Sequence, residues 1–555
     1  MKRSCPTQNA EYQHPKTNVD SDRKDLDFVP LDEICCKITY FSIITFAETR
    51  EENFIFATKI DSTMKKHLII TILFIVLGLG QISAQETKPI YNASKFGIRS
   101  DGVTMNTRSI QYAIDWISEQ GGGTLRFWVG RYLTGSIHLK SNVTIELVEG
   151  AILVGSTNPF DYDRFNAIGD RALIMAEGVE NIKLIGVYNS GGCIDGQGRE
   201  LGNKCTEMVH AGVVKDKLSN DRVGEGFRPR LLHFRECKNI EVQNVTFRNA
   251  ANWVTMYDQC ENTVVDNVRI QSCAFWNNDG IDIVDCDGFL LKDSYINSSD
   301  DAICLKSHTN KKICQNVEVR NCTARSSASG IKFGTMGAGG FKNVKVINNR
   351  VYDTYRSAIT IQSVDGGICE NILVDSLNAV NVGNAIYLNV GARRDKQSFI
   401  DGITISNLYC EVAEGKPDAG YEYEGPVEDL PRNISPCGII GLKDSKIKNV
   451  TLENIEIVFP GGGDKHYAYI GLDELDKVPE MPKAYPEFSQ HEELPAWGFF
   501  VRHVDGLTMK NIKLTALKKD YRTAIVLDDV QNQTISKLSV TEPNGKKKDA
   551  IFERK

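Results

Sequence analysis

The stretch C-K-N-I-E-V-Q-N-V-T-F, residues 237–247, and the stretch C-E-N-T-V-V-D-N-V-R-I, residues 260–270, decide the fold of this chain. Each begins with Cys, has Asn two positions later and continues into β-branched and apolar residues. The pattern of an apolar residue or Cys, any residue, Asn or Gly, and then a β-run recurs at residues 179–182, 237–240, 260–263, 286–289, 314–317, 341–344, 369–372, 400–403, 447–450 and 504–507.

The spacing of this pattern indicates a solenoid. From Cys237 to Cys369 its intervals are 23, 26, 28, 27 and 28 residues, and self-similarity at a fixed period is the signature of stacked structural repeats. The strands are short and no crossover helices separate them. Asn and Gly suit the turns because they tolerate left-handed backbone angles. The sequence therefore predicts an all-β parallel β-helix.

Cysteine placement supports the same interpretation. The cysteines that open the repeats share their phase with Phe341 and Ile400, so we expect a ladder of buried, free thiols inside the coil. There is no C-x-x-C motif and no Cys–His cluster, and we expect neither disulfides nor a metal site.

Composition and the N-terminal segment bear on location. The net charge is −7 with no basic patch, which disfavours nucleic acid as a partner. A basic start at Met64, an apolar run over 68–79 and small residues near 84 resemble a secretory signal peptide, and the run is too short to span a bilayer comfortably. We expect residues 1–63 to be a non-native or disordered extension, 64–84 the signal peptide and 85–555 the β-helix domain. The alternative is a real extension with an internal anchor helix.

One helix and two insertions interrupt the repeat. Apolar residues at helical spacing predict a helix over 106–120, which we expect to cap the open N-terminal end of the stack. We expect no further long helix. Longer intervals late in the chain indicate inserted loops at 415–436 and 461–498, which we expect to shape a binding cleft and to favour exo action.

Four acidic residues carry the candidate chemistry: Asp279, Asp282, Asp300 and Asp301. Asp279 and Asp300 are 21 residues apart, close to one coil, so both can face one substrate site. Glycosidic cleavage needs one protonated carboxyl as acid and one carboxylate as base, and crowding of carboxylates separates their pKa values. The alternative is that these residues are solvated turn and edge charges.

The motifs around these residues resemble a known family. N-N-D-G-I-D at 277–282 and S-S-D-D-A-I-C-L-K-S at 298–307 are similar to the N-T-D and D-D-x-I-x-I-K-S motifs of family 28 glycoside hydrolases. Those enzymes are right-handed, single-stranded parallel β-helices that cleave pectin with inversion and need no cofactor. The resemblance implies that Asp300 is the general acid, that Asp279 and Asp301 activate water, and that Lys306 binds substrate. We also expect substrate binding by Asn277, Asp282 and Lys332.

Two family motifs are absent. Ser329 stands where polygalacturonases have the His of G-H-G, and T-I-Q at 360–362 replaces the cationic R-I-K. Loss of both cations argues against plain polygalacturonate, and the S-G-x-x-x-G pattern is closer to rhamnogalacturonan hydrolases. The residues that could supply replacement charge, unless they are surface cations, are Lys332, Arg356, Arg393 and Arg394.

The sequence thus predicts a secreted or periplasmic, monomeric, inverting hydrolase of galacturonic-acid-containing pectic polysaccharide. Two alternatives stay open. One is a β-helix polysaccharide lyase, with the acidic cluster as a Ca²⁺ site and Lys306 or Lys332 as base. The other is a non-catalytic carbohydrate-binding β-helix.

Overall fold

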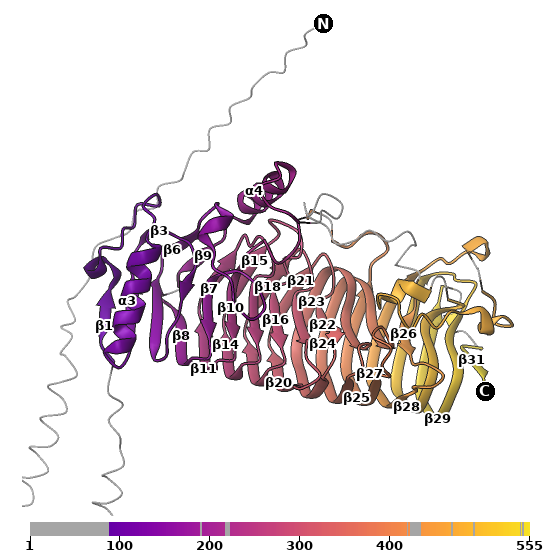
Figure 1. The fold of residues 1–555 in the computed structure, drawn as a ribbon. Coiled ribbons are helices and arrows are strands. Elements are labelled where there is room, and N and C mark those ends of the chain that lie inside the picture. The colour runs from indigo at the N-terminus through magenta and orange to yellow at the C-terminus, as the bar shows by residue number, and fades with distance from the viewer. Residues whose placement is uncertain are drawn as a thin grey trace, which may run out of the picture. The chain divides into compact units, whose positions relative to one another are not determined.

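The computed structural model describes residues 88–555, apart from 189–190, 217–222, 419, 422–434, 468–469, 492–493, 544 and 547–548. The predicted extension and signal peptide lie outside the described residues. Residues 88–555 form one compact unit, in which successive coils of β-strand stack from the indigo to the yellow end of the ribbon (Figure 1).

Three rows of parallel strands form the faces of this stack. The first row contains β4 (Ile137–His138), β7 (Ala172–Glu177), β10 (Arg230–Arg235), β13 (Thr255–Asp258), β16 (Ile281–Val284), β19 (Ile303–Ser307), β22 (Ile331–Gly337), β26 (Cys437–Ile440) and β31 (Ile551–Arg554). The second row contains β1 (Ile90–Asn92), β2 (Gly123–Phe127), β5 (Val143–Val148), β8 (Glu180–Val187), β11 (Lys238–Gln243), β14 (Glu261–Asp266), β17 (Asp287–Lys292) and β20 (Cys314–Arg320).

The third row and the later coils complete the body. The third row contains β3 (Gly130–Thr134), β6 (Ala151–Gly155), β9 (Cys193–Asp195), β12 (Thr246–Arg248), β15 (Arg269–Ser272), β18 (Tyr295–Ser298) and β21 (Thr323–Ser326). Later strands are long because they continue around a corner of the coil: β23 (Gly340–Ser363), β24 (Ile368–Val390), β25 (Phe399–Val412), β27 (Ile447–Gly461), β28 (Ala496–Lys518) and β29 (Thr523–Glu542). A short strand, β30 (Gly545–Lys546), pairs antiparallel with β29. The predicted all-β parallel β-helix is confirmed.

The cysteine ladder forms part of the interior. Cys314 pairs in register with Phe341, Phe341 with Cys369, and Cys369 with Ile400. All four side chains are buried, and every cysteine among the described residues is a free thiol. The interchange of Cys, Phe and Ile at one phase therefore reflects a shared apolar environment.

Asparagines form the turns, as their backbone freedom predicts. Asn239, Asn262 and Asn343 all have left-handed φ values between 53° and 55°. Their side chains also stack: the Asn262 amide donates to Asn239 Oδ1 at 3.3 Å, and the Asn343 amide donates to Asn316 Oδ1 at 3.2 Å. Each turn thus satisfies the side-chain polar groups of its neighbour along the stack.

The N-terminal helix occurs where the sequence predicts it. Helix α3 (Thr107–Glu119) follows the short 3-10 helix η1 (Ala93–Phe96) and buries one apolar face in the main core. It packs against β2, β4 and β5 at the start of the stack (Figure 1). Its role as a cap stays a prediction.

The expectation of no further long helix is wrong. Helix α4 (Gly198–His210) buries Leu201 and Cys205. The pattern was hard to recognise because glycines at 198 and 202 lower helix propensity. Gly202 is required by close packing, since a Cβ there would lie 2.7 Å from the Phe275 ring.

The second predicted insertion folds onto the outside of the stack. Its described residues include η5 (Leu475–Lys477) and η6 (Phe488–His491), and they share a small apolar cluster with Tyr387, Phe500 and Val526. The insertion also contains η4 (Lys465–Tyr467), and one further 3-10 helix, η2 (Pro159–Asp161), lies in an earlier loop. Over the part of the chain that the structure describes, no helix is long and apolar enough to cross a membrane.

Candidate active site

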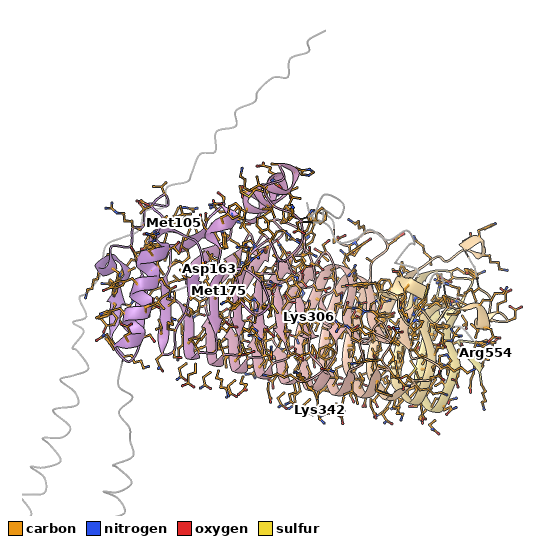
Figure 2. All side chains as sticks on the ribbon, viewed as in Figure 1. Met105, Asp163, Met175, Lys306, Lys342 and Arg554 are labelled. Carbon is orange, nitrogen blue, oxygen red and sulfur yellow. The ribbon has the colours of Figure 1, made fainter. Side chains whose placement is uncertain are left out.

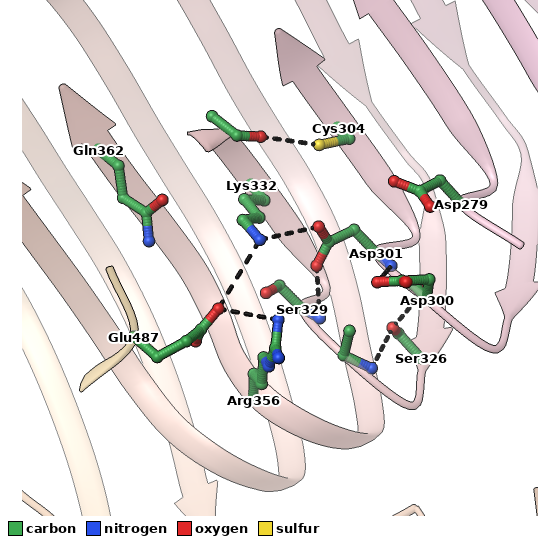
Figure 3. A network of polar contacts seen from close by, with 12 residues as sticks. Asp279, Asp300, Asp301, Cys304, Ser326, Ser329, Lys332, Arg356, Gln362 and Glu487 are labelled. Carbon is green, nitrogen blue, oxygen red and sulfur yellow. Dashed lines mark hydrogen bonds and ion pairs between the residues drawn. The ribbon is translucent and has the colours of Figure 1, made fainter. Parts of the chain in front are cut away.

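Three carboxylates meet where the third row of strands turns into the first. The register of β13, β16, β19 and β22 places Trp253, Asp279, Asp301 and Ser329 at the same position of successive coils. One oxygen atom from each of Asp279, Asp300 and Asp301 lies within 4.8 Å of the others. Figure 3 shows the three side chains close together, with the Asp301 carboxylate on the side of Lys332. The one-coil spacing read from the sequence therefore brings these residues together.

A bend between β18 and β19 lets adjacent aspartates share one site. The hydroxyls of Ser298 and Ser326 both donate to the main-chain carbonyl of Asp300, at 2.8 and 2.6 Å. The Asp301 amide donates to Asp300 Oδ1 at 2.9 Å. These bonds hold the chain out of extended geometry, in which neighbouring side chains would point to opposite faces.

Lys306 links two of the acidic residues. Its ammonium donates to Asp279 Oδ2 at 2.9 Å and to Asp282 Oδ1 at 2.7 Å, and it lies 4.4 Å from the centre of the Trp253 ring. All of these side chains are at least nine-tenths buried, and Asp282 has no exposed surface. Asp282 therefore contacts the site through Lys306, and substrate binding by Asp282 stays a prediction.

Asp301 pairs with a different lysine, Lys332. Lys332 lies 2.9 Å from Asp301 Oδ2, and the Ser329 main-chain amide donates to Asp301 Oδ1 at 3.0 Å. Ser329 thus contributes through its backbone, although its side chain replaces the family's histidine. Lys332 and Arg356, two of the candidate replacement cations, both lie within this group.

Burial and charge shift the aspartate pKa values in different directions. Burial raises the pKa of Asp300, and the neighbouring Asp301 adds to this. Burial also raises the pKa of Asp301, but Lys332, Lys306 and Arg356 outweigh it and bring that pKa to about 2. The pKa of Asp279 is raised well above its ordinary value by burial, against the pull of Lys306. Burial raises the pKa of Asp282 to about 6. The site thus combines at least one ionised carboxylate with others that retain protons more readily.

The inserted segment supplies residues that the sequence did not indicate. Glu487 lies 2.8 Å from Arg356 and 3.7 Å from Lys332, and the Tyr485 hydroxyl is 3.2 Å from Lys332. Gln362, at the position of the family's second cation, instead donates to the main-chain carbonyl of Pro486. The insertion has no periodicity from which these contacts could be predicted.

Trp253 was also missed, although a signal for it exists. It stands two residues before the first register position of β13, as Asp279 and Asp301 stand before theirs. Arg230 lies 4.7 Å and His308 6.4 Å from its ring centre. Burial, followed by Lys306 and Arg230, lowers the pKa of His308 to about 4, so this imidazole is neutral at mildly acidic pH.

The remaining predicted residues lie farther from the carboxylates or point elsewhere. The Asn277 side chain accepts a hydrogen bond from Arg228 at 2.8 Å. Arg393 and Arg394 lie 3.1 and 3.7 Å from buried Asp365. Substrate contact by Asn277 stays a prediction.

Carboxylates gathered in one site, with different tendencies to hold a proton, are what glycoside hydrolases use to cleave a glycosidic bond. The sequence profile of Glycosyl hydrolases family 28 matches residues 126–419, and the chain belongs to this family. It is a glycoside hydrolase that acts on O-glycosyl bonds.

Similar proteins include both sequence relatives and solved structures. The chain is 24% identical over 436 residues to an exo-poly-α-D-galacturonosidase of Dickeya chrysanthemi, a match that covers 66% of this chain and 71% of the relative. The family 28 exopolygalacturonase of Yersinia enterocolitica shares the fold with a TM-score of 0.59 and 17% identity, over 81% of this chain and 78% of that one. The exopolygalacturonase of Thermotoga maritima has a TM-score of 0.52 and 24% identity, over 67% and 87%.

Proposed function

We propose that this enzyme hydrolyses galacturonic-acid-containing pectic polysaccharide. The observation that carries the proposal is the triad of Asp279, Asp300 and Asp301, with one oxygen of each within 4.8 Å of the others. The name of the Dickeya chrysanthemi relative, an exo-poly-α-D-galacturonosidase, supports a galacturonide substrate. Exo action is part of the same proposal.

In the proposed mechanism Asp300 protonates the leaving oxygen. Its raised pKa keeps the carboxyl protonated to higher pH than an ordinary aspartic acid. Asp301, with its pKa near 2, is ionised and is the stronger candidate for the base. Asp279 is the second water-binding group. Its raised pKa opposes a base role, and the direct bond from Lys306 favours its ionised form.

One water molecule can contact both Asp301 and Asp279. Oxygens no more than 4.8 Å apart can both accept hydrogen bonds of about 2.8 Å from the same water. Attack by that water on the face of the sugar opposite the leaving group would give inversion. Proton NMR of the first-formed anomer tests this outcome, and retention would contradict it.

Lysine ionisation disfavours the lyase alternative. Burial lowers the pKa of Lys306, but Asp279 and Asp282 outweigh burial and raise it well above its ordinary value. Burial likewise lowers the pKa of Lys332, but Asp301 and other nearby groups outweigh burial and raise that pKa well above its ordinary value. A protonated lysine cannot remove a proton from carbon. Lyase action would create an ultraviolet-absorbing double bond and would be lost with chelator.

The experiment that tests the proposal is a product screen on homogalacturonan and rhamnogalacturonan fractions. Wild-type enzyme should release reducing ends, and Asp300→Asn should lower kcat by about 100-fold or more. Asp293→Asn is the matched control, because Asp293 lies in an exposed turn of the same stack. Unchanged hydrolysis by Asp300→Asn would contradict the assignment, and so would equal losses in both variants.

Export and oligomeric state complete the proposal. The signal-like segment at 64–84 supports a secreted or periplasmic enzyme, and a monomeric state belongs to the same proposal. N-terminal sequencing of the exported protein should find a start near residue 85, and light scattering should give the mass of one chain.

A further inference from the structure

Two buried cations beside the catalytic carboxylates share an anion that belongs to the protein itself. Lys332 and Arg356 are 1% and 3% exposed. Arg356 lies 2.8 Å from the Glu487 carboxylate and Lys332 lies 3.7 Å from it. A guanidinium and an ammonium around one carboxylate form a site with the charge and size of a carboxylate ligand. Figure 3 shows Glu487 in that position, across from Asp301.

The segment that carries Glu487 is firmly held. Gln362 binds the carbonyl of Pro486, and the Gln490 side chain donates to the Tyr387 hydroxyl at 2.8 Å. Phe488 is 2% exposed and packs edge-on against Tyr387, with ring centres 6.3 Å apart. The residues on both sides of Glu487 are thus anchored to the coil stack, and its carboxylate is a fixed part of the site beside Lys332 and Arg356.

The charge balance around Lys332 and Arg356 determines which sugar group can bind beside them. Asp301 neutralises one of the two cations and Glu487 neutralises the other. A sugar carboxylate entering here would find no unpaired positive charge in the pair. It would also approach two fixed carboxylates in a water-poor environment, where repulsion between like charges is strong.

We propose that Glu487 is a specificity-determining residue that occupies the anion site of Lys332 and Arg356. The sugar unit bound on this side of Asp301 then carries no free carboxylate. Its chemistry is that of a neutral sugar or of a uronate whose carboxyl is esterified. This inference rests on the proposed pectic substrate.

The first test measures binding without catalysis. Isothermal titration calorimetry compares D-galacturonate with its methyl ester, for the wild type and for Glu487→Gln. The wild type should bind the ester at least as tightly as the free acid. The near-isosteric variant frees one cation, so its affinity for the acid relative to the ester should rise about tenfold. A wild type that prefers the free acid would overturn the inference, as would an unchanged ratio in the variant or no binding of either probe.

The second test separates the two sources of a neutral unit. The kcat/KM of both proteins is measured on unesterified homogalacturonan, methyl-esterified homogalacturonan and rhamnogalacturonan fragments. In the wild type, kcat/KM on methyl-esterified homogalacturonan or on rhamnogalacturonan fragments should exceed kcat/KM on unesterified homogalacturonan. The better of these two substrates shows whether the uncharged unit is an esterified uronate or a neutral sugar. Glu487→Gln should shift the preference about tenfold toward the unesterified substrate, and no shift would refute the assignment.

Glu474→Gln is the matched control, since Glu474 lies in the same insertion and pairs with Lys477 near the surface. It should leave both ratios unchanged. If no pectic substrate is cleaved, the proposed function fails. The acid-to-ester binding ratio still tests the anion site in that case.

Discussion

Replacing Lys306 with Met should destabilise the protein more than any surface lysine change. Lys306 is 5% exposed and is the shared partner of Asp279 and Asp282, which are 4% and 0% exposed. Methionine keeps a similar length and apolar stem but removes the charge. Two buried carboxylates then lose a cation at hydrogen-bond distance.

The expected cost follows from these two contacts. A hydrogen bond to a charged group contributes about 1.5–3 kcal/mol, and breaking a buried ion pair from one side costs about 3–5 kcal/mol. We therefore expect the free energy of unfolding at pH 8 to fall by about 3–5 kcal/mol. The same change at Lys342, which pairs with Glu370 at 2.9 Å but is 39% exposed, should cost no more than about 1 kcal/mol. Figure 2 labels both lysines.

The cost should depend on pH in a definite direction. The folded-state pKa values of Asp279 and Asp282 are already raised, the latter to about 6, and loss of Lys306 raises them further. A carboxyl whose pKa is higher in the folded state binds more protons there, so stability falls as pH rises through that range. At pH 4.5 both groups hold protons and the penalty should shrink to about 1–2 kcal/mol.

Guanidinium unfolding followed by far-ultraviolet circular dichroism measures both effects. Wild type, Lys306→Met and Lys342→Met are compared at pH 4.5 and pH 8. Equal penalties for Lys306→Met at the two pH values would refute the argument that uncompensated buried carboxylates cause the loss. A penalty no larger than that of Lys342→Met would refute the ion pair's importance.

Three further predictions concern catalysis and the thiols. Ser329→Ala should keep kcat within about threefold, because the contact with Asp301 comes from the main-chain amide, and a 100-fold loss would show a role for the hydroxyl. The value of kcat/KM should fall as pH rises through the raised pKa of Asp300, because the general acid must be protonated. Asp301, with its pKa of about 2, stays ionised above about pH 3. Activity that rises up to pH 8 would contradict this assignment of acid and base. Dithiothreitol should leave the melting temperature unchanged because the described cysteines are free thiols, and a drop of several degrees would reveal a disulfide.

Local patterns were sufficient for much of the fold. Asn239 and Asn262 adopt the left-handed turns expected of them, and Cys314, Phe341 and Cys369 stack at one phase. The predicted helix at 106–120 occurs as Thr107–Glu119. Helix α4 was missed because its glycines weaken the helical pattern and its partner, Phe275, comes from a distant coil.

The sequence by itself determined the stack and the meeting of Asp279 with Asp300 and Asp301, because a solenoid converts spacing along the chain into adjacency between coils. Only the tertiary structure decided the charges around them. Lys306 pairs with Asp279 and Asp282, which lie one coil away. Glu487 belongs to an aperiodic insertion whose path depends on the surface it packs against. Ionisation and specificity depend on distances of a few ångströms in a buried environment, where Coulomb energies are large.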